Sequence, residues 1–334
     1  MKAEIAAIEY ALPDRCVTND ELDRLHPSWS IHKVAEHTGV HARFVCGEEE
    51  TALDLAIVAC ERLLERVEVA REDVDAIVFC TQSPDYVMPP NATLLQHRLG
   101  LPLGVAAFDY SLACSGFIYG LWMGKALIES NLAENILLVT AEAYSKYINP
   151  GDRGTMALFG DGAAATLLRV GTKGVGEFVL GTDGSGGQRF IVPAGGARVP
   201  RSKATCVEKV DASGNVRTQE NIYMDGPAVL AFVKQQVPRC VRELLAKTGY
   251  TYDDISMFIF HQASAMSLDY LERALAIPTE KLYRNLSRVG NTVSASIPIA
   301  IRDAQDEGVI APGSRLLLTG FGVGYSWGAC VVEL

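Results

Sequence analysis

The most constraining feature of this 334-residue chain is an alternation of short apolar runs with helical patterns. The runs AEIAAIEYAL and DAIVFCTQ predict strands. They flank the periodic stretch TALDLAIVACERLLERV, which predicts a helix with Thr51 as its N-cap. The strand-like runs NILLVTAEA and AAATLLRV follow before residue 171. Regular alternation of strand and helix is typical of a layered α/β fold.

The same order of elements then occurs a second time. Residues 71–83, REDVDAIVFCTQS, match residues 252–264, YDDISMFIFHQAS, in having an acidic turn, an apolar strand, and then Gln and Ser. A period far above about 50 residues indicates a duplicated domain and not a solenoid. We therefore predict two similar halves that share a core, an N-terminal half at 1–171 and a C-terminal half at 172–334.

Residues from about 193 to 221 interrupt the second half. This stretch is rich in Gly, Pro and charged residues, which predicts a loop excursion outside the core. Its basic residues include Arg198, Arg201, Lys203 and Lys209. Two interpretations remain open here, a solvated loop or a rim that meets an acidic carrier or a phosphate.

Composition excludes several functional classes. The formal net charge is −10, so the chain lacks the basic footprint of a nucleic-acid-binding protein. No apolar run reaches the roughly 18 residues of a membrane span, and the first residues do not resemble a secretory signal. The eight cysteines include no C-x-x-C pair, which indicates reduced thiols, no metal centre and a cytoplasmic location.

One cysteine, Cys114, stands between the strand VAAFDYSLA and a helix predicted over about 115–130. This helix is apolar on nearly all sides, and glycines at 116, 120 and 124 would let another helix approach closely. The positive end of a buried helix dipole favours an anion, which would make Cys114 a thiolate nucleophile. The alternative is a cysteine that only fills the core.

Two further polar residues are candidates for a site with Cys114. His261 directly follows the strand MFIF, and α/β sheets place their sites at the carboxyl ends of strands. Asn291, in VGNTVSASIPIAI, is either a helix cap or a site residue. The duplication would bring these two residues of the second half to Cys114 of the first, as a Cys-His-Asn set without the local signatures of a papain-type protease.

The order of motifs along the whole chain resembles the β-ketoacyl-ACP synthase III family of the thiolase-like superfamily. The motifs that carry the resemblance are LACSGF, FGDGAAA, HQAS, GNTVSASIP and FGVGYSWG, with ALPDRCVTNDEL, HTGVHARF and DRGT. The resemblance implies an α/β fold in which two duplicated βαβαβαββ halves form a five-layer αβαβα sandwich. It also implies an acyltransferase of fatty acid biosynthesis or of a specialised, secondary-metabolic pathway.

The resemblance further implies the role of each catalytic residue. Cys114 would take an acyl group as a thioester, with the backbone N–H groups of Cys114 and Val323 as the oxyanion hole. His261 and Asn291 would bind the thioester carbonyl of a malonyl donor and stabilise the enolate formed when CO₂ leaves. The substrates would be acyl-CoA or acyl-ACP thioesters, with no other cofactor.

Binding residues follow from the same resemblance. Met88 would reach across a homodimer to close the partner's acyl pocket, and Arg43 and Arg153 would contact coenzyme A or the acyl carrier protein. The chain departs from the family where an Arg usually follows the HQ motif, since residues 263–266 are Ala-Ser-Ala-Met. It also has Lys33, His37 and Pro227 where the family commonly has Trp, Arg and Asn.

Two alternative functions remain open at this point. In the first, the acyl group passes from Cys114 to an oxygen or nitrogen nucleophile without decarboxylation, and His261 acts as general base. In the second, the chain is a non-catalytic subunit that completes a partner's active site. The complete Cys-His-Asn set argues against this second alternative.

Overall fold

The computed structural model describes residues 2–67 and 69–334, and two sheets form its centre. Within these residues, the strand order is β1-β7-β6-β4-β5 in the first sheet and β13-β14-β15-β8 in the second. The first sheet comprises β1 (Lys2–Ala11), β4 (Ala76–Cys80), β5 (Ala106–Tyr110), β6 (Asn135–Glu142) and β7 (Gly162–Gly171). The second comprises β8 (Val175–Thr182), β13 (Met257–Phe260), β14 (Arg315–Gly322) and β15 (Ser326–Glu333).

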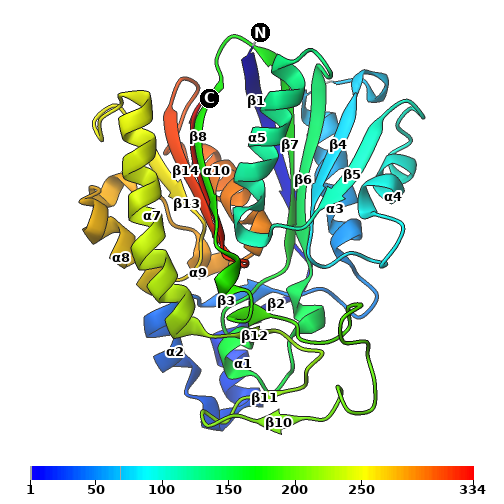
Figure 1. Ribbon diagram of the computed structural model, residues 1–334, viewed down its shortest axis with the longest axis vertical. Coiled ribbons are helices and arrows are strands. Elements are labelled where there is room, and N and C mark those ends of the chain that lie inside the picture. Colours follow the sequence, from blue (N-terminus) through cyan, green and yellow to red (C-terminus); the bar gives the residue numbers. More distant parts are fainter. Residues whose placement is uncertain (1, 68) are drawn as a thin grey trace.

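Helices cover both outer faces of the sheets and fill the space between them (Figure 1). The outer helices are α3 (Ala52–Val67) and α4 (Asn91–Arg98) on the first sheet, and α7 (Gly226–Thr248) and α8 (Ala265–Leu275) on the side of the second. The central helices are α5 (Gly116–Glu129) and α10 (Ser296–Asp306). These layers confirm the predicted thiolase-like αβαβα sandwich.

Short elements cap the end of the sandwich at which the site lies, in the lower part of Figure 1. They are β2 (Cys16–Thr18), α1 (Asn19–Leu25), α2 (Ile31–Thr38), β3 (Ala42–Phe44), α6 (Arg153–Met156), β9 (Phe190–Ile191), β12 (Tyr223–Met224) and α9 (Leu286–Val289). The predicted excursion contains a small hairpin of β10 (Lys209–Val210) and β11 (Val216–Arg217).

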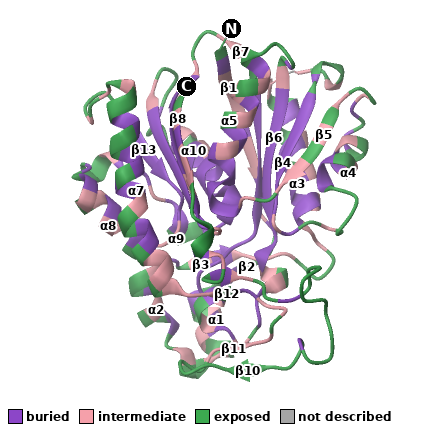
Figure 2. Cartoon of the chain, viewed as in Figure 1, coloured by how far each residue is buried: buried purple, intermediate pink, exposed green. Residues whose placement is uncertain are grey.

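Local sequence explains the main elements. Strand β4 is buried along its whole length because parallel neighbours flank it and helices cover both of its faces, which accounts for its continuous apolar run. Figure 2 shows the same burial along the central strands. Helix α3 begins as predicted at Thr51, whose backbone N–H donates to the Asp54 carboxylate while its hydroxyl accepts from the Asp54 N–H.

The glycine stripe of α5 packs against the first sheet, so the prediction of a close helix neighbour is wrong. A Cβ at Gly120 would lie 2.4 Å from Leu138 of β6, and one at Gly124 would lie 2.4 Å from Leu168 of β7. Glycine therefore brings the backbone of this buried helix close to the strands. The same contact fixes the start of α5, where Cys114 lies.

The two halves are alike down to the turns before their central helices. A 3-10 turn, Ala113–Ser115, precedes α5, and another, Val293–Ala295, precedes α10. Both turns contain a residue with positive φ, Ala113 at 22° and Val293 at 53°. The two sheets differ at one edge. In the first sheet β5 pairs with β4, whereas among the described residues a single bridge between Phe258 and Leu282 takes the equivalent position beside β13. The boundary between 171 and 172 stays a prediction.

Candidate active site

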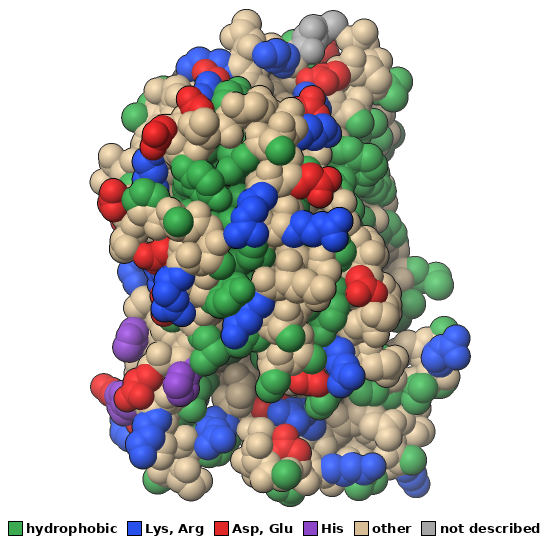
Figure 3. All heavy atoms as spheres, turned by 60° about the vertical axis from the view of Figure 1, so that its left-hand side comes forward, with side chains coloured by type: hydrophobic (Ala, Val, Ile, Leu, Met, Phe, Trp, Pro, Cys, Tyr) green, Lys and Arg blue, Asp and Glu red, His purple; other side chains and the backbone are tan. Residues whose placement is uncertain are grey.

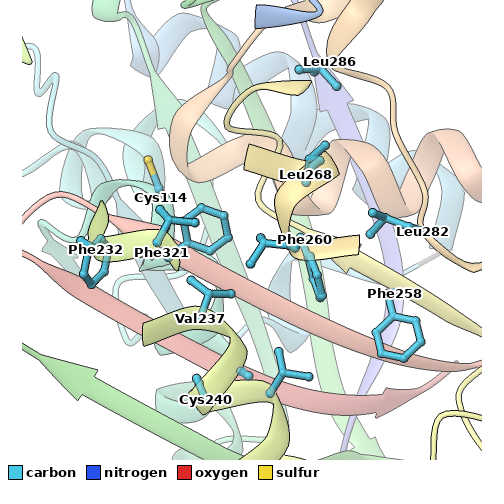
Figure 4. Packing of buried hydrophobic residues seen from close by; sticks show 14 of the residues in the cluster. Cys114, Phe232, Val237, Cys240, Phe258, Phe260, Leu268, Leu282, Leu286 and Phe321 are labelled. Atoms are coloured by element: carbon cyan, nitrogen blue, oxygen red, sulfur yellow. The ribbon is translucent and has the colours of Figure 1, made fainter. Parts of the chain in front are cut away.

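Cys114 lies in the 3-10 turn between β5 and α5, at the carboxyl end of the first sheet. Its side chain is buried, with 3% of the residue exposed. Figure 4 shows its sulfur beside Phe321, at one end of the apolar cluster that packs under α7. The turn that holds it includes Ala113 in the left-handed region, so the backbone bends sharply immediately before the thiol.

The end of strand β14 presses on this turn. A Cβ at Gly322 would lie 2.8 Å from the Cβ and 3.0 Å from the Sγ of Cys114, and one at Gly320 would lie 2.7 Å from the Cys114 carbonyl oxygen. Any larger residue at these two positions would displace the cysteine. The hydroxyls of Ser115 and Ser326, 2.7 Å apart, join this turn to the start of β15.

Burial and charge hold Cys114 in its thiol form. Burial raises the pKa of the Cys114 thiol, and the nearby carboxylate of Glu142 raises it further, while the backbone hydrogen bond at Cys114 itself opposes them. The expectation that the helix dipole alone yields a thiolate is therefore wrong. Loss of the thiol proton must accompany attack on the acyl group.

His261 follows β13 and is held between the second sheet and α10. Its backbone N–H donates to the Thr319 carbonyl at 2.8 Å, and its ring meets Phe321 edge to face with centroids 5.4 Å apart. The Nδ1 atom lies 2.7 Å from the Ser296 hydroxyl. Burial lowers the pKa of His261 to about 3, so the imidazole is neutral near pH 7.

Ser296 determines which nitrogen of His261 carries the proton. A neutral imidazole has one donor and one acceptor nitrogen. We assign the Ser296 hydroxyl as donor to Nδ1, which leaves Nε2 protonated and able to donate to a ligand. Ser296 was not among the site residues predicted from the sequence. The signal was its place as the first residue of the helix that follows Asn291.

Asn291 is fixed by both halves of the molecule. Its backbone N–H donates to Leu158 O at 2.9 Å, and its carbonyl accepts from Gly160 N–H at 3.0 Å. Its side chain is oriented as well, because Oδ1 accepts from the Val293 N–H at 3.0 Å and Nδ2 donates to Ala263 O at 3.2 Å. One N–H of the carboxamide remains available.

A continuous set of contacts joins the three predicted residues. Phe321 touches the ring of His261, and the next residue, Gly322, touches Cys114. Ala263, two residues after His261, accepts from Asn291. The structure thus brings Cys114, His261 and Asn291 together at one end of the two sheets, as the duplication predicts.

Glu142, at the end of β6, is a buried carboxylate that the sequence analysis missed. It accepts from the Gln82 N–H at 2.9 Å, the Ser83 hydroxyl at 3.1 Å and the Ser294 hydroxyl at 2.9 Å. Ser294 belongs to the turn of the second half, so this carboxylate ties the two halves together near Cys114. A lone acidic residue that ends a buried apolar strand was the available signal.

Glu142 makes the stability of the protein depend on pH. Burial raises the pKa of Glu142 from 4.5 to about 7. The folded state therefore holds this proton more tightly than the unfolded chain, and stability falls as pH rises from about 4.5 to about 7. Full ionisation of Glu142 therefore lowers the free energy of unfolding by roughly 3 kcal/mol, at about 1.4 kcal/mol per pKa unit. We expect Glu142→Gln to flatten this dependence in urea unfolding between pH 5 and pH 8.

The exposed Glu134→Gln variant, in the loop before the same strand, is the matched control. It should keep the slope of the wild-type protein. An unchanged slope in Glu142→Gln would show that the carboxylate is already ionised in the folded state at pH 5.

The other residues predicted for the site are Val323, Met88, Arg153 and Arg43. Val323 follows β14, and its N–H donates to no protein acceptor among the described residues, as an oxyanion donor requires. Met88, in the loop before α4, is 79% exposed and points away from the core of its own chain. Arg153 is half-buried and donates to Trp29 O at 3.4 Å. The roles of these three residues stay predictions.

Arg43 is not available to a ligand, which corrects its assignment to coenzyme A or carrier binding. The residue is 1% exposed. Its guanidinium donates to Val17 O at 3.2 Å, Asn19 Oδ1 at 2.7 Å and Ala157 O at 2.8 Å. Arg43 instead holds β2, β3 and α1 against Ala157. The residues that follow Ala157 form the backbone hydrogen bonds with Asn291. A motif match does not reveal whether a side chain points inward.

The described residues contain no cluster of three or more His, Cys, Asp or Glu that could hold a metal ion. Among the same residues, no helix is both long enough and apolar enough to cross a membrane.

Comparison with known proteins places this site in a family. The model of the 3-oxoacyl-[acyl-carrier-protein] synthase III family matches residues 108–184, and the model of its C-terminal domain matches residues 245–334. A β-ketoacyl-[acyl-carrier-protein] synthase III of Streptomyces coelicolor is 38% identical over 325 residues, which cover 96% of this chain and 94% of the relative. A synthase III of Caldanaerobacter subterraneus is 37% identical, covering 96% and 95%.

Solved structures agree with the sequence matches. A crystal structure of a 3-oxoacyl-(acyl-carrier-protein) synthase III has a TM-score of 0.98 at 44% identity and covers all of both chains. The priming β-ketosynthase of the R1128 polyketide pathway has a TM-score of 0.87 at 28% identity, covering 100% of this chain and 96% of the other.

A thiolase-like fold that presents a buried cysteine to a neutral histidine and an asparagine defines a condensing acyltransferase. More narrowly, the chain belongs to the 3-oxoacyl-[acyl-carrier-protein] synthase III family. The predicted family, fold and acyltransferase class are confirmed. The hypothesis of a non-catalytic partner subunit is set aside.

Proposed function

We propose that this protein loads an acyl group onto Cys114 and condenses it with a malonyl-type thioester, releasing CO₂. The observation that carries this proposal is that His261, held through Nδ1 by Ser296, and Asn291, held through Nδ2 by Ala263 O, lie at the same end of the sheets as the buried Cys114. Incubation with an acyl-CoA and malonyl-ACP tests it, with a 3-oxoacyl thioester as the expected product by mass spectrometry. Disappearance of acyl-CoA without that product would contradict the proposal.

In the first step, the Cys114 sulfur attacks the thioester carbonyl of the acyl donor and loses its proton. The N–H groups of Cys114 and Val323 donate hydrogen bonds to the developing oxyanion. The carbon–sulfur bond to the donor then breaks, and the donor leaves as a thiol with the proton that Cys114 lost. Covalent attachment divides a difficult transfer into two easier ones.

In the second step, the malonyl thioester carbonyl accepts hydrogen bonds from His261 Nε2–H and Asn291 Nδ2–H. The free carboxylate of the malonyl group leaves as CO₂, and the electron pair of the broken carbon–carbon bond forms an enolate. The enolate carbon attacks the acyl carbonyl, the bond to Cys114 breaks, and the sulfur regains a proton. A preorganised donor in a site without water is worth about 3 kcal/mol to such a charge.

The protonation state of His261 favours condensation over transfer to an oxygen or nitrogen nucleophile. A general base works best when its pKa lies near the working pH. Burial lowers the pKa of His261 to about 3, so this imidazole is a weak base but remains a hydrogen-bond donor. Stabilising an enolate needs a donor, whereas activating a hydroxyl or amine needs a base.

We also infer a homodimer formed through the edge of the first sheet. Strand β5 is an edge strand, since it pairs only with β4 among the described residues. Its Phe108 is 39% exposed, and in the loop before α4 Val87 is 95% exposed and Met88 79%. An uncovered edge with apolar side chains beside it is suited to pairing with a second chain.

The dimer predicts an effect of Met88 on acyl chain length. If Met88 closes the acyl pocket of the partner subunit, Met88→Phe should shift the preferred acyl-CoA toward shorter chains. Acylation rates by intact-protein mass spectrometry across a series of straight chains measure this. Leu132→Phe is the control, because Leu132 is also exposed but lies beyond the far end of α5. An unchanged chain-length preference in Met88→Phe would show that Met88 does not line the acyl pocket.

The thiol carrier of the substrates is coenzyme A or an acyl carrier protein. Lys33 and His37 are exposed on α2, and Arg153 lies nearby against Trp29, so these residues form the basic edge available to either carrier. Figure 3 shows Lys and Arg side chains distributed over the face that carries α7 and α8, mixed with apolar ones. Arg43 takes no part in this surface.

A further inference from the structure

A cavity of about 850 Å³ opens beside the active-site turn, and part of its wall is polar. Ser111 and Val323 line it. Ser111 comes shortly before the turn that holds Cys114, and Val323 directly follows Gly322, which contacts Cys114. Phe190 and Ile222 provide an apolar wall. A chain attached to Cys114 can therefore extend into a space that is not uniformly apolar.

Arg201 is the unexpected member of this wall. Of the five basic residues in the 193–221 excursion, it is the one that lines the cavity. Its guanidinium makes no hydrogen bond with the described residues, but it forms an ion pair with Glu220, whose Oε2 is 3.6 Å from Nε. The other oxygen of Glu220 already accepts from the Thr205 hydroxyl at 2.6 Å.

Tyr147 provides a second hydrogen-bond donor in the wall. Its hydroxyl makes no hydrogen bond with the described residues, whereas the neighbouring Tyr144 hydroxyl donates to Gln82 at 2.6 Å. Arg201 lies close enough to lower the pKa of the Tyr147 phenol, against the larger effect of burial. A cation and a hydroxyl donor thus share one region of the wall.

The acidic residue of the same wall is already engaged. Asp85 accepts from the Thr51 hydroxyl at 3.1 Å and from the Asn91 side chain at 3.4 Å, and its own N–H donates to Asn91. Its carboxylate is therefore directed toward the starts of α3 and α4. Arg201 is therefore the charged side chain of this wall whose N–H groups make no hydrogen bond with the described residues, and a ligand carboxylate would compete with Glu220 for it.

We propose that this cavity selects acyl chains that end in a carboxylate, which pairs with Arg201 and accepts from Tyr147. The preferred acyl donors are then thioesters of dicarboxylic acids, with the far carboxylate free. An arginine provides paired donors that match a carboxylate, and the apolar wall accommodates the methylene groups between the two ends. This inference rests on the proposed acylation of Cys114 and adds the class of acyl group.

The test compares two series of acyl-CoA thioesters of four to seven chain carbons. One series ends in a carboxylate and the other in the uncharged, isosteric carboxamide. Acylation of Cys114 is followed by intact-protein mass spectrometry at low salt and at 0.5 M NaCl. For the best chain length we expect the carboxylate to react about tenfold faster than the amide. We expect this preference to shrink at high salt, because the Arg201 side chain is 65% exposed.

Arg201→Met should abolish this preference while keeping acylation by the amide series. Lys209→Met, in the same excursion but outside the cavity wall, should retain it. Equal rates for both series in the wild-type protein, or a preference that survives Arg201→Met, would overturn the inference and leave Cys114 acylation intact. Failure of every thioester to acylate the protein would contradict the proposed function itself.

Discussion

A Cys114→Ser variant is expected to form no detectable acyl-enzyme with any acyl thioester. Serine is a far weaker nucleophile than cysteine unless an adjacent base activates it, and His261 is a poor base because burial lowers its pKa to about 3. We expect the acylation rate to fall at least about 1,000-fold, in line with the loss of a covalent nucleophile. The measurement is the mass of the intact protein after incubation with acyl-CoA.

Cys240→Ser is the matched control for this experiment. Cys240 is also buried, belongs to the same apolar cluster as Cys114 and lies on α7 in Figure 4. Its replacement should lower stability modestly and leave the acyl mass shift in place. A normal mass shift in Cys114→Ser would show that another residue is the nucleophile.

A His261→Ala variant is expected to separate the two half-reactions. The variant should still acylate Cys114, because the oxyanion donors of that step are backbone N–H groups. Decarboxylation of the malonyl thioester should fall about 100-fold or more, since one of two enolate donors is lost. Acyl-enzyme mass and CO₂ release, measured on the same sample, distinguish the two effects.

Two companion variants make the result specific. Ser296→Ala keeps the imidazole but removes the hydroxyl that fixes its tautomer, so it should show a smaller loss of decarboxylation with normal acylation. His97→Ala removes an exposed histidine on α4 and should behave as the wild-type protein. Condensation at the wild-type rate in His261→Ala would exclude the role given to this residue.

Local patterns were sufficient to predict much of the fold. Thr51 caps α3 as its sequence indicates, and the strand that ends before His261 lies at 257–260. The duplication predicted that residues 114, 261 and 291 meet, because equivalent strand ends of the two halves lie at the same edge. These features depend on periodicity, turn residues and symmetry, which are all readable along one chain.

Features that depend on distant contacts could not be predicted in this way. Glu142 receives a hydrogen bond from Ser294, 152 residues further along the chain. The interior position of Arg43 depends on Ala157, 114 residues away. The pKa of Cys114 is raised by burial and by Glu142 against a favourable local backbone. In each case the deciding partner comes from a distant part of the sequence.

The central claim is that one sulfur holds the acyl group until a decarboxylated malonyl unit removes it. The most direct test loads the protein with an acyl group, removes the donor, and adds malonyl thioester labelled in its free carboxylate. The ratio of labelled CO₂ released to acyl groups lost from Cys114 should be one to one, with a 3-oxoacyl thioester as product. Loss of the acyl group without release of label would contradict this claim.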